Sequence, residues 1–429
     1  MPVDYFKNPV RTLIGSFFAW KALLFTIAIG SGIGTAYDTS TTLMSAERSS
    51  PRESLFDLAA RLTRWDAIYY VQASRRGYLY EQEWAFGSGL PTVISFFTKL
   101  IKSFGVESDG SVEPLVGIFV ANASHLLSVL VLYQLGLVVW KSPRLSFTAA
   151  LLHVLSPAGM FLSAPYSEST FSFLSFMGYL FFCKAILSEK RTVAHDVSLV
   201  ASGMWFGFAA TFRSNGILNG ILFAVELLRE LSVAPTFTSI RRRFVLIVAG
   251  SAIAVGFVLP QIAAYQTFCS SDSIVSTRPW CASSLPSIYS FVQEHYWNVG
   301  FLRYWTPGNI PLFLLAAPMI YILMKSGLEI IRRPYIPIPE KANSETPPNR
   351  AATLRSMAAS QIVLTALAIT NYHIQIITRI SSGYPSWYWW LAGLLGNNST
   401  SRLGGNIVIF MIMYAGIQGA LFASFLPPA

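Results

Sequence analysis

The sequence predicts an all-α polytopic membrane protein, and three observations lead to that prediction. Hydrophobic residues make up 53% of the 429 residues. Charged residues make up only 12%, whereas soluble domains have about 25%. Several segments also contain the roughly 20 apolar residues that a helix needs to cross the hydrocarbon core of a bilayer. We therefore expect a single membrane domain over residues 1–429 and exclude a soluble globular enzyme.

The apolar segments define about ten expected transmembrane helices. They cover residues 12–36, 115–140, 145–164, 168–187, 197–212, 215–231, 244–266, 309–328, 355–376 and 404–426. The first is too long and too weakly basic in front for a cleaved signal peptide, so we interpret it as a retained span. Arg213-Ser214-Asn215-Gly216 interrupts the apolar stretch 197–231 and favours two helices there. An even number of spans places both termini on one side of the membrane.

The positions of lysine and arginine give the orientation of these spans. The formal net charge is +10, but the cations lie in separate groups rather than in one patch. The groups are Lys141/Arg144, Lys184/Lys190/Arg191, Arg241/Arg242/Arg243, Lys325/Arg332/Arg333 and Lys341/Arg350/Arg355. With a cytosolic N-terminus all of them fall on the cytosolic side, as the positive-inside rule requires. This distribution argues against nucleic-acid binding and places segments 37–114, 165–167, 213–214, 267–308 and 377–403 on the opposite side.

Two long loops and a linker connect the spans. Loop 37–114 is long enough to suggest a function. We expect an amphipathic helix at 54–62 and an interfacial or re-entrant helix pair over 84–104, broken at Gly87-Ser88-Gly89 and Pro91. An extra span at 90–106 would put the basic loops on the wrong side and is rejected. Residues 334–353 contain five prolines and predict a flexible cytosolic linker.

Three cysteines and two overlapping sequons bear on the non-cytosolic loops. Cys183 lies in an apolar run and is expected to pack as a small hydrophobe. Cys269 and Cys281 flank a polar loop, where a bridge would suit an oxidising lumen; two free thiols are the alternative. The sequons at Asn397 and Asn398 lie in the expected last non-cytosolic loop and weakly support the orientation.

The most informative candidate for chemistry is Asp66, which follows Arg64-Trp65 and precedes Arg75 and Arg76. A carboxylate beside a membrane can take a proton from an attacking hydroxyl, and nearby cations can stabilise a phosphate. A juxtamembrane ion pair without function explains the same residues.

Other polar residues interrupt the apolar segments on the same side. Glu168 follows Ser167 and is either functional or the first residue of a capped helix. Arg213 next to Asn215 binds phosphate or merely extends to the interface. The segment 293–305, with Trp297, Asn298 and Arg303, has the composition of a sugar-binding surface. An aromatic belt explains it better, and the same holds for Arg379 and for residues 387–390.

Several chemistries lack support. The five histidines are scattered, and the chain contains neither HExxH nor DxD, so no metal site is expected. It also lacks a Walker loop and GxGxxG, which leaves nucleotide-driven chemistry without a motif. No cofactor is evident.

Six segments, in order along almost the whole chain, resemble the GPI mannosyltransferase 2 family in its fungal form. They are Leu62-Thr63-Arg64-Trp65-Asp66-Ala67-Ile68-Tyr69-Tyr70, Ser156-Pro157-Ala158 with Tyr166-Ser167-Glu168-Ser169, Phe212-Arg213-Ser214-Asn215-Gly216, Pro279-Trp280-Cys281, Tyr296-Trp297-Asn298-Val299-Gly300-Phe301-Leu302-Arg303-Tyr304-Trp305 and Ile310-Pro311-Leu312-Phe313. The linker 334–353 lies outside the resemblance. It implies a GT-C type glycosyltransferase of the endoplasmic reticulum membrane with a lumenal active site.

The resemblance also implies an activity. Such an enzyme transfers the second mannose, in an α-1,6 linkage, from dolichyl-phosphate mannose to the GPI anchor precursor. The donor is β-linked and the product α-linked, so one base and a single displacement suffice, comparable to an inverting glycoside hydrolase. A small membrane-bound partner subunit is expected as well.

Residue roles follow from the resemblance by position. Asp66 is expected to be the catalytic base, with Arg64 and Trp65 beside the substrate. Arg213 and Arg303 are expected to contact phosphate or glycan. Glu168 and Asn215 are assigned to acceptor orientation, and Trp297 and Asn298 to substrate binding.

Rival functions remain open at this point. Another dolichyl-phosphate-mannose-dependent GT-C transferase differs only in its acceptor, which the sequence does not display. A secondary transporter predicts inverted repeats, and we find none to defend. A non-catalytic assembly subunit predicts that Asp66→Ala leaves activity intact.

Overall fold

The computed structural model describes residues 7–31, 59–105, 110–188, 192–269, 278–334 and 346–426. Within these ranges the regular secondary structure is helical, as expected. Residues 32–58, 189–191 and 335–345 lie outside them. Three predicted features therefore fall partly outside the described residues. They are residues 54–58 of the expected helix 54–62, residues 335–345 of the expected linker, and the cations Lys190, Arg191 and Lys341.

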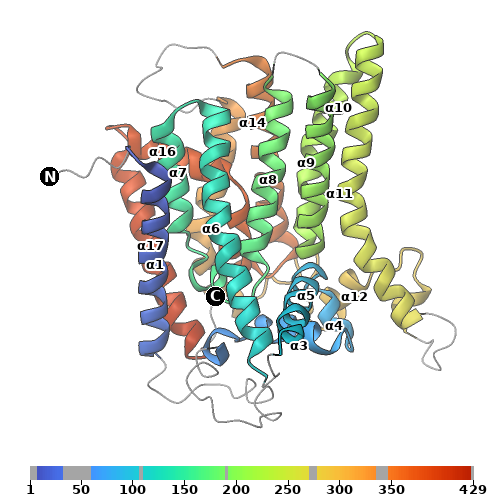
Figure 1. Ribbon diagram of the computed structural model, residues 1–429, viewed down its shortest axis with the longest axis vertical. Helices are drawn as coiled ribbons and strands as arrows, with labels where there is room; N and C mark the ends of the chain where they lie inside the picture. The colour runs from blue at the N-terminus through green and yellow to red at the C-terminus, as the bar shows by residue number, and fades with distance from the viewer. Residues whose placement is uncertain are drawn as a thin grey trace.

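The helical bundle runs along the long axis of the molecule (Figure 1), and ten helices of the described part of the chain correspond to the expected spans. They are α1 (Pro9–Ser31), α6 (Val112–Trp140), α7 (Pro143–Val154), α8 (Glu168–Ile186), α9 (Val193–Phe212), α10 (Gly220–Leu231), α11 (Phe237–Cys269), α13 (Ile310–Arg332), α14 (Pro348–Asn371) and α17 (Ser401–Ala423). Each expected span overlaps one of them. The helical membrane architecture predicted from composition is thus confirmed.

Seven of the described helices are long and apolar enough to span a membrane, namely α1, α6, α8, α11, α13, α14 and α17. The other three differ for identifiable reasons. The helix α9 has 20 residues but contains His195 and Asp196 near its start. The helices α7 and α10 have only 12 residues each, because Ser156-Pro157 follows the first and a 3-10 turn, η3 (Ser214–Asn219), precedes the second. These interruptions place irregular backbone within the bundle.

The two ends of the bundle have different character. The end that bears Lys141, Arg144, Arg241–Arg243 and Arg332–Arg333 is called the basic end here. At the other end, called the loop end, lie α3 (Asp66–Arg76), α4 (Glu81–Trp84), α5 (Gly89–Ser103) and α12 (Ile288–His295) (Figure 1). The expected interfacial pair over 84–104 is thus a short α4 and a 15-residue α5, with the break at Gly87 and Ser88.

A disulfide joins Cys269 at the end of α11 to Cys281 in η4 (Pro279–Ala282), with 5.7 Å between the Cα atoms. The predicted bridge is therefore confirmed, and Cys183 is a buried free thiol. Around the bridge a small core forms from Trp84, Phe268, Trp280, Ile288 and Val292. We call α4, η4, α12 and this core the cap.

The segment 377–403 does not form the expected loop on one side of the membrane. Its helix α16 (Ser386–Gly396) runs inside the bundle to the basic end. The indole nitrogen of Trp390 donates to Glu329 near the end of α13 at 2.6 Å, and the Trp389 ring lies 5.9 Å from that of Trp140 at the end of α6. Trp387 and Tyr388 are fully buried, so this aromatic run is core and the belt interpretation was wrong.

The path of α16 changes the topology. The helix α17 starts at the basic end, where Leu395 packs on Gly404, and returns to the loop end, where Ser424 donates to the carbonyl of Ser31 at 3.1 Å. The described chain therefore begins at the basic end and finishes at the loop end. The prediction that both termini share one side was wrong, and Asn397 lies at the basic end.

Candidate active site

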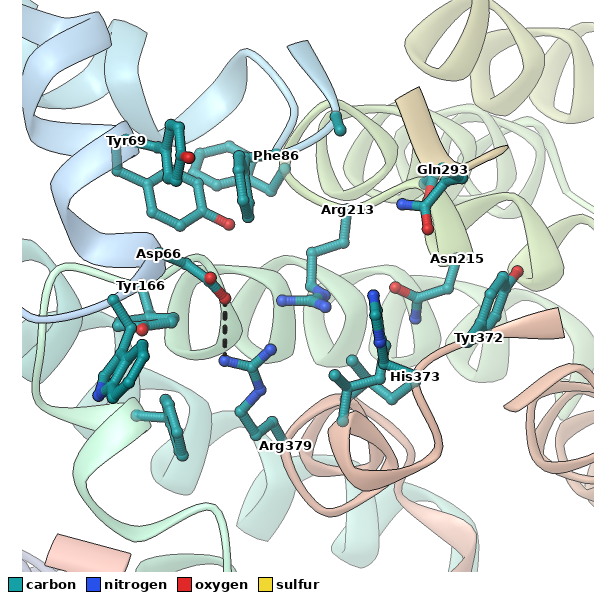
Figure 2. A pocket seen from close by; sticks show the side chains of 18 of the residues that line it. Asp66, Tyr69, Phe86, Tyr166, Arg213, Asn215, Gln293, Tyr372, His373 and Arg379 are labelled. Atoms are coloured by element: carbon teal, nitrogen blue, oxygen red, sulfur yellow. Dashed lines mark hydrogen bonds and ion pairs between the residues drawn. The ribbon is translucent and has the colours of Figure 1, made fainter. Parts of the chain in front are cut away.

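A cavity of about 490 Å³ lies between the loop-end helices and the bundle. Figure 2 shows its side chains converging from α3, the α9–η3 junction, α12 and the segment 372–380. Its lining comprises Trp65, Asp66, Tyr69, Tyr70, Ala85, Phe86, Phe161, Tyr166, Phe212, Arg213, Ser214, Asn215, Tyr289, Gln293, Trp297, Tyr372, His373, Gln375, Ile376, Arg379 and Ile380. Segments far apart in the sequence thus form one site.

Asp66 is the first residue of α3, and its carboxylate points into the cavity (Figure 2). Its side chain is 33% exposed, while the neighbouring Ala67 and Tyr70 are buried and hold the helix against the bundle. A carboxylate in the first turn interacts favourably with the helix dipole. The preceding Trp65 has a positive φ of 55°, which is costly for a large side chain and is typical of functional sites.

Arg379, in α15 (Ile377–Ile380), makes the closest described ion pair to this carboxylate. Its Nη1 donates to Oδ2 of Asp66 at 3.2 Å, and its Nε lies 3.7 Å from Oε1 of Glu168. The guanidinium also lies over the ring of Phe161 at 4.6 Å. Its sequence neighbourhood suggested a belt-like role for Arg379, and that interpretation was wrong.

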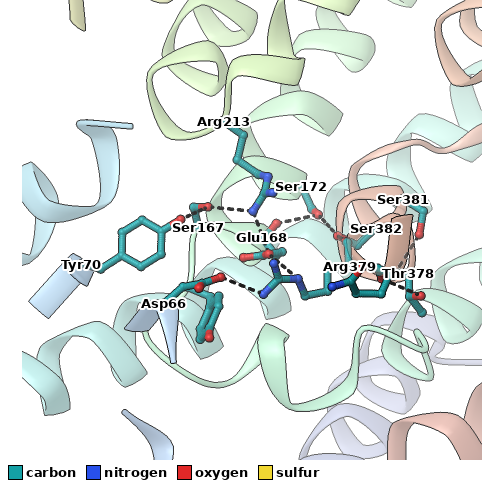
Figure 3. Close-up of polar contacts among 12 residues, drawn as sticks. Asp66, Tyr70, Ser167, Glu168, Ser172, Arg213, Thr378, Arg379, Ser381 and Ser382 are labelled. Atoms are coloured by element: carbon teal, nitrogen blue, oxygen red, sulfur yellow. Dashed lines mark hydrogen bonds and ion pairs between the residues drawn. The ribbon is translucent and has the colours of Figure 1, made fainter. Parts of the chain in front are cut away.

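The fully buried side chain of Glu168 bridges two of the arginines that line the cavity, Arg213 and Arg379 (Figure 3). Its Oε1 accepts from Nη1 of Arg213 at 2.7 Å, and the same Nη1 lies 3.3 Å from the hydroxyl of Ser167. That hydroxyl is 3.0 Å from the Tyr70 hydroxyl. Glu168 does not line the cavity. Because its contacts are with two arginines, it holds these side chains rather than facing a bound acceptor.

The site depends on irregular backbone at membrane depth, which must be hydrogen-bonded inside the protein. Between α7 and α8 the chain forms a 3-10 turn, η2 (Gly159–Leu162), that presents Phe161 to Arg379. The buried ammonium of Lys21 donates to the carbonyl of Leu162 at 3.0 Å and to the hydroxyl of Ser163 at 2.7 Å. Asn122 donates to the carbonyl of Ser163 at 3.0 Å. Two bundle helices thereby fix the turn.

A second anchor fixes the other wall. The backbone nitrogen of Ser88 donates to the carbonyl of Thr211 at 3.0 Å, beside Arg213. Gly87 has a positive φ of 80°, and a Cβ there would overlap the carbonyl oxygens of Thr211 and Phe212. The break predicted between α4 and α5 is thus the point at which the first loop docks onto the end of α9.

The far side of the cavity is aromatic and polar. Asn215 donates to the hydroxyl of Tyr384 at 3.3 Å. Trp297 packs on Phe86, with ring centres 5.5 Å apart, and faces His373 at 6.3 Å. Burial lowers the pKa of His373; Asp66 opposes this change and Arg379 reinforces it.

Five of the expected residues line the cavity, namely Trp65, Asp66, Arg213, Asn215 and Trp297, and Glu168 lies beneath it. Three others do not line it. Arg303 pairs with Glu294 at 2.7 Å, and both side chains are exposed. Asn298 is a turn residue with a φ of 49°. The guanidinium of Arg64 lies over the Phe425 ring at 4.7 Å.

The two arginines expected beside Asp66 lie elsewhere. Arg75 is 3.3 Å from Glu113, and Arg76 pairs with Glu83. They lie at the opposite end of α3 from Asp66 and point to other partners. The cations that face the cavity come instead from Arg213 and Arg379, of which the sequence identified only Arg213.

The arrangement determines what the cavity can do chemically. One accessible carboxylate can accept a proton from a hydroxyl, and two guanidinium groups can stabilise an anion in a partly desolvated site. Within the described part of the chain, no three His, Cys, Asp or Glu side chains are grouped so that they could hold a metal ion.

A family model and several curated proteins match almost the whole length of this chain. Residues 22–429 match the family model described as Mannosyltransferase (PIG-V). GPI mannosyltransferase 2 of Chaetomium globosum is 50% identical, covering 98% of this chain and 97% of that protein. The protein of the same name from Gibberella zeae is 45% identical, with 100% and 99% covered, and that of Aspergillus oryzae is 39% identical, with 99% and 96% covered.

Two solved structures resemble the fold of this chain, with lower sequence identity than the relatives above. ArnT from Cupriavidus metallidurans bound to undecaprenyl phosphate gives a TM-score of 0.47 at 15% identity, covering 93% of this chain and 64% of that one. The apo oligosaccharyltransferase of Archaeoglobus fulgidus gives 0.43 at 15% identity, covering 96% and 56%.

Proposed function

The chain belongs to the PIG-V mannosyltransferase family and is a multi-pass glycosyltransferase of GPI-anchor synthesis; from this premise we propose its reaction in detail. The donor is dolichyl-phosphate mannose. The acceptor is the GPI precursor that carries its first mannose, and the new bond is α-1,6. The observation that supports this proposal most is Asp66, one accessible carboxylate facing a cavity that two arginines also line.

The reaction is a single displacement. The acceptor oxygen attacks C1 of the donor mannose on the face opposite the phosphate, and its proton passes to the carboxylate of Asp66. As the new O–C1 bond forms, the bond between C1 and the phosphate oxygen breaks, and dolichyl phosphate leaves with the electron pair. Inversion at C1 converts the β-linked donor into an α-linked product, and no covalent enzyme intermediate is needed.

The compartment is part of the same proposal. The basic end faces the cytosol under the positive-inside rule, which puts the cavity at the lumenal face of the endoplasmic reticulum membrane. The cap disulfide at this end suits an oxidising compartment. A polyprenyl donor with its tail in the bilayer presents its phosphate at this level. The small membrane partner subunit implied by the resemblance remains a prediction.

Complementation tests the proposal. Cells that lack the second GPI mannosyltransferase receive this chain, and their GPI precursors are identified by mass spectrometry. The proposal expects the one-mannose precursor to disappear and later precursors to return. Accumulation of the one-mannose lipid despite a folded, membrane-inserted protein would contradict it. Rescue of cells lacking the first or third mannosyltransferase instead would indicate another acceptor.

A further inference from the structure

The two cavity arginines have different surroundings, and we propose that they have different tasks. Arg379 is a positioning residue that orients the carboxylate of Asp66, and Arg213 is the arginine that contacts the donor phosphate. This division of labour rests on the proposed function. The inference assigns Arg379 a role that the proposed function leaves open, and this role differs from the role of Arg213.

The stereochemistry of inversion separates the two tasks in space. The base lies on the acceptor side of the sugar, and the group that assists departure lies on the opposite side. In inverting glycoside hydrolases the two groups are roughly 6.5–9.5 Å apart. Arg379 lies 3.2 Å from Asp66 and is therefore on the side of the base. A phosphate held by Arg379 in this position would lie on the face from which the acceptor must attack.

The contacts of Arg379 suit an orienting role. Its Nη1 donates to Asp66, its Nε faces Glu168, and its plane lies over the ring of Phe161. The side chain is only 13% exposed. Contacts on two edges and one face restrict the orientation of this planar guanidinium. It can thus keep the Asp66 carboxylate in one rotamer as the acceptor hydroxyl approaches.

Arg213 has donor capacity that the protein leaves unused. Its Nη1 contacts Glu168 at 2.7 Å and Ser167 at 3.3 Å, whereas its Nε is buried without a hydrogen-bond partner. Buried donors are nearly always paired. Because Arg213 lines the cavity (Figure 2) and its side chain is 15% exposed, its guanidinium can donate to an anionic oxygen bound there.

Glu168 links the two arginines. Both approach the same oxygen, Oε1, at 2.7 Å for Arg213 and 3.7 Å for Arg379 (Figure 3). The buried charge of Glu168 holds each arginine in its own place, since the described ion pairs join Asp66 with Arg379 and not with Arg213. Glu168 therefore fixes the two arginines relative to each other, one of them paired with Asp66 and the other not.

Steady-state kinetics and a binding measurement test the division. The full-length chain and its Arg379→Gln, Arg379→Lys, Arg213→Gln and Arg213→Lys variants are assayed with dolichyl-phosphate mannose varied at saturating acceptor. Binding of a short-chain dolichyl phosphate is measured separately on the purified proteins. Arg303→Gln is the matched control, because Arg303 is an exposed loop-end arginine paired with an exposed Glu294.

The expected results differ between the two positions. Arg379→Gln lowers kcat by about 100-fold, the order of loss caused by a misplaced reacting group, and leaves the donor KM and dolichyl phosphate binding almost unchanged. Arg379→Lys recovers part of kcat. Arg213→Gln raises the donor KM and weakens dolichyl phosphate binding by about tenfold or more, as expected for a lost charged hydrogen bond. Arg213→Lys keeps the charge and weakens binding less, and Arg303→Gln resembles the wild type.

Three outcomes would overturn the inference: an unchanged kcat in Arg379→Gln, dolichyl phosphate binding weakened as much by Arg379→Gln as by Arg213→Gln, or binding unaffected by Arg213→Gln. If thermal unfolding shows that Arg379→Gln does not fold, Arg379→Lys is used instead. A lower kcat with an unchanged donor KM in that variant supports the inference, and an unchanged kcat overturns it. A wild-type protein that binds dolichyl phosphate but transfers no mannose contradicts the proposed function. In that case the comparison of dolichyl phosphate binding between Arg213→Gln and Arg379→Gln still tests whether Arg213 alone contacts the phosphate.

Discussion

Two buried glutamates at the loop end bridge several donors, yet only one supports the cavity. In the cap, Oε1 of Glu81 accepts from Trp280 at 2.8 Å and from Arg278 at 2.6 Å, and Oε2 accepts from Tyr296 at 2.8 Å. Beneath the cavity, Oε1 of Glu168 serves two arginines, and its Oε2 is buried without a partner. Both carboxylate oxygens of the cap glutamate are thus paired, whereas only one oxygen of the site glutamate is.

The two glutamates also differ in what their partners face. Glu81 ties α4 to the disulfide-linked loop and to Tyr296, and these partners engage both of its oxygens. Glu168 holds guanidinium groups that face an open cavity, and both it and Arg213 keep unpaired atoms. An unpaired buried polar group needs an explanation, and the proposed phosphate site beside Arg213 supplies one.

The sharpest test of the comparison is Glu168→Gln, for which we expect the largest effect of the variants that bear on these two glutamates. Removing this charge leaves Arg213 and Arg379 without their buried counter-charge. Losing one partner of a buried ion pair is strongly destabilising, because the remaining charge stays buried and uncompensated. We expect mannose transfer to fall by about 100-fold or more as both arginines shift. Initial rates are normalised to the amount of monodisperse protein. Transfer close to the wild-type rate would show that Glu168 is only structural.

Removing the disulfide affects the cap more than the charge cluster. The bridge closes a short loop with a sequence separation of 12, and losing a native disulfide typically costs about 2–5 kcal/mol. The Cys269→Ser/Cys281→Ser variant should unfold at a lower temperature, with a smaller loss of transfer than Glu168→Gln at permissive temperature. An unchanged unfolding midpoint would show that the cap is stable without the bridge.

Glu81→Gln should have a smaller effect on stability, of about 1–3 kcal/mol, from weakened hydrogen bonds to a charged group. Burial raises the pKa of Glu81, but hydrogen bonds from Trp280, Tyr296 and Arg278 outweigh it and hold the pKa below its ordinary value of 4.5. The folded pKa is depressed, so the stabilisation is present above pH 4.5 and is lost as the pH falls through the folded pKa.

Acid titration of thermal stability checks this sign. The unfolding midpoint of the wild type should fall more steeply below pH 4.5 than that of Glu81→Gln, and the two should converge there. A constant difference between them at acidic pH would contradict an ionised Glu81 in the cap.

The smallest effect is expected at the basic end, where Asn397 and Asn398 should remain unglycosylated. Asn397 Oδ1 accepts locally from the backbone and hydroxyl of Ser399 at 3.1 and 2.9 Å, and α16 brings it to the basic end, which the proposed orientation places in the cytosol. Glycosidase treatment should not change the gel mobility of the protein. As a control, Ala282→Asn in the cap creates a new sequon with Ser283 and Ser284 and should be glycosylated. A glycan at Asn397 would contradict the topology.

Sequence reasoning identified much of the fold and part of the site, for physical reasons. Long apolar segments identify bundle helices because a bilayer requires them. Asp66 and Arg213 were found because each is a polar residue at a break between apolar segments. Arg379 was missed because its partner Asp66 lies 313 positions away, and nothing in its own neighbourhood distinguishes a site arginine from an interfacial one.

Other errors came from patterns that two environments share. The aromatic run 387–390 has the composition of an interfacial belt, but in the structure it fills the core between α6 and α13. Arg303 lies close in sequence to Trp297, yet its side chain is exposed and pairs with Glu294, whereas Trp297 lines the cavity. Which side chains converge depends on tertiary contacts that composition and spacing do not contain.

The most direct test of the central claim is the rate of mannose transfer by Asp66→Asn. Microsomes that lack the native second mannosyltransferase receive the wild type, Asp66→Asn or the exposed control Glu294→Gln, with dolichyl-phosphate mannose and the one-mannose GPI precursor. We predict that Asp66→Asn loses about 10²–10⁴-fold in rate, which is the contribution of a positioned base. The protein level and the unfolding temperature of Asp66→Asn should match those of the wild type. The control Glu294→Gln should transfer mannose at the wild-type rate. Transfer by Asp66→Asn at the wild-type rate would contradict the account.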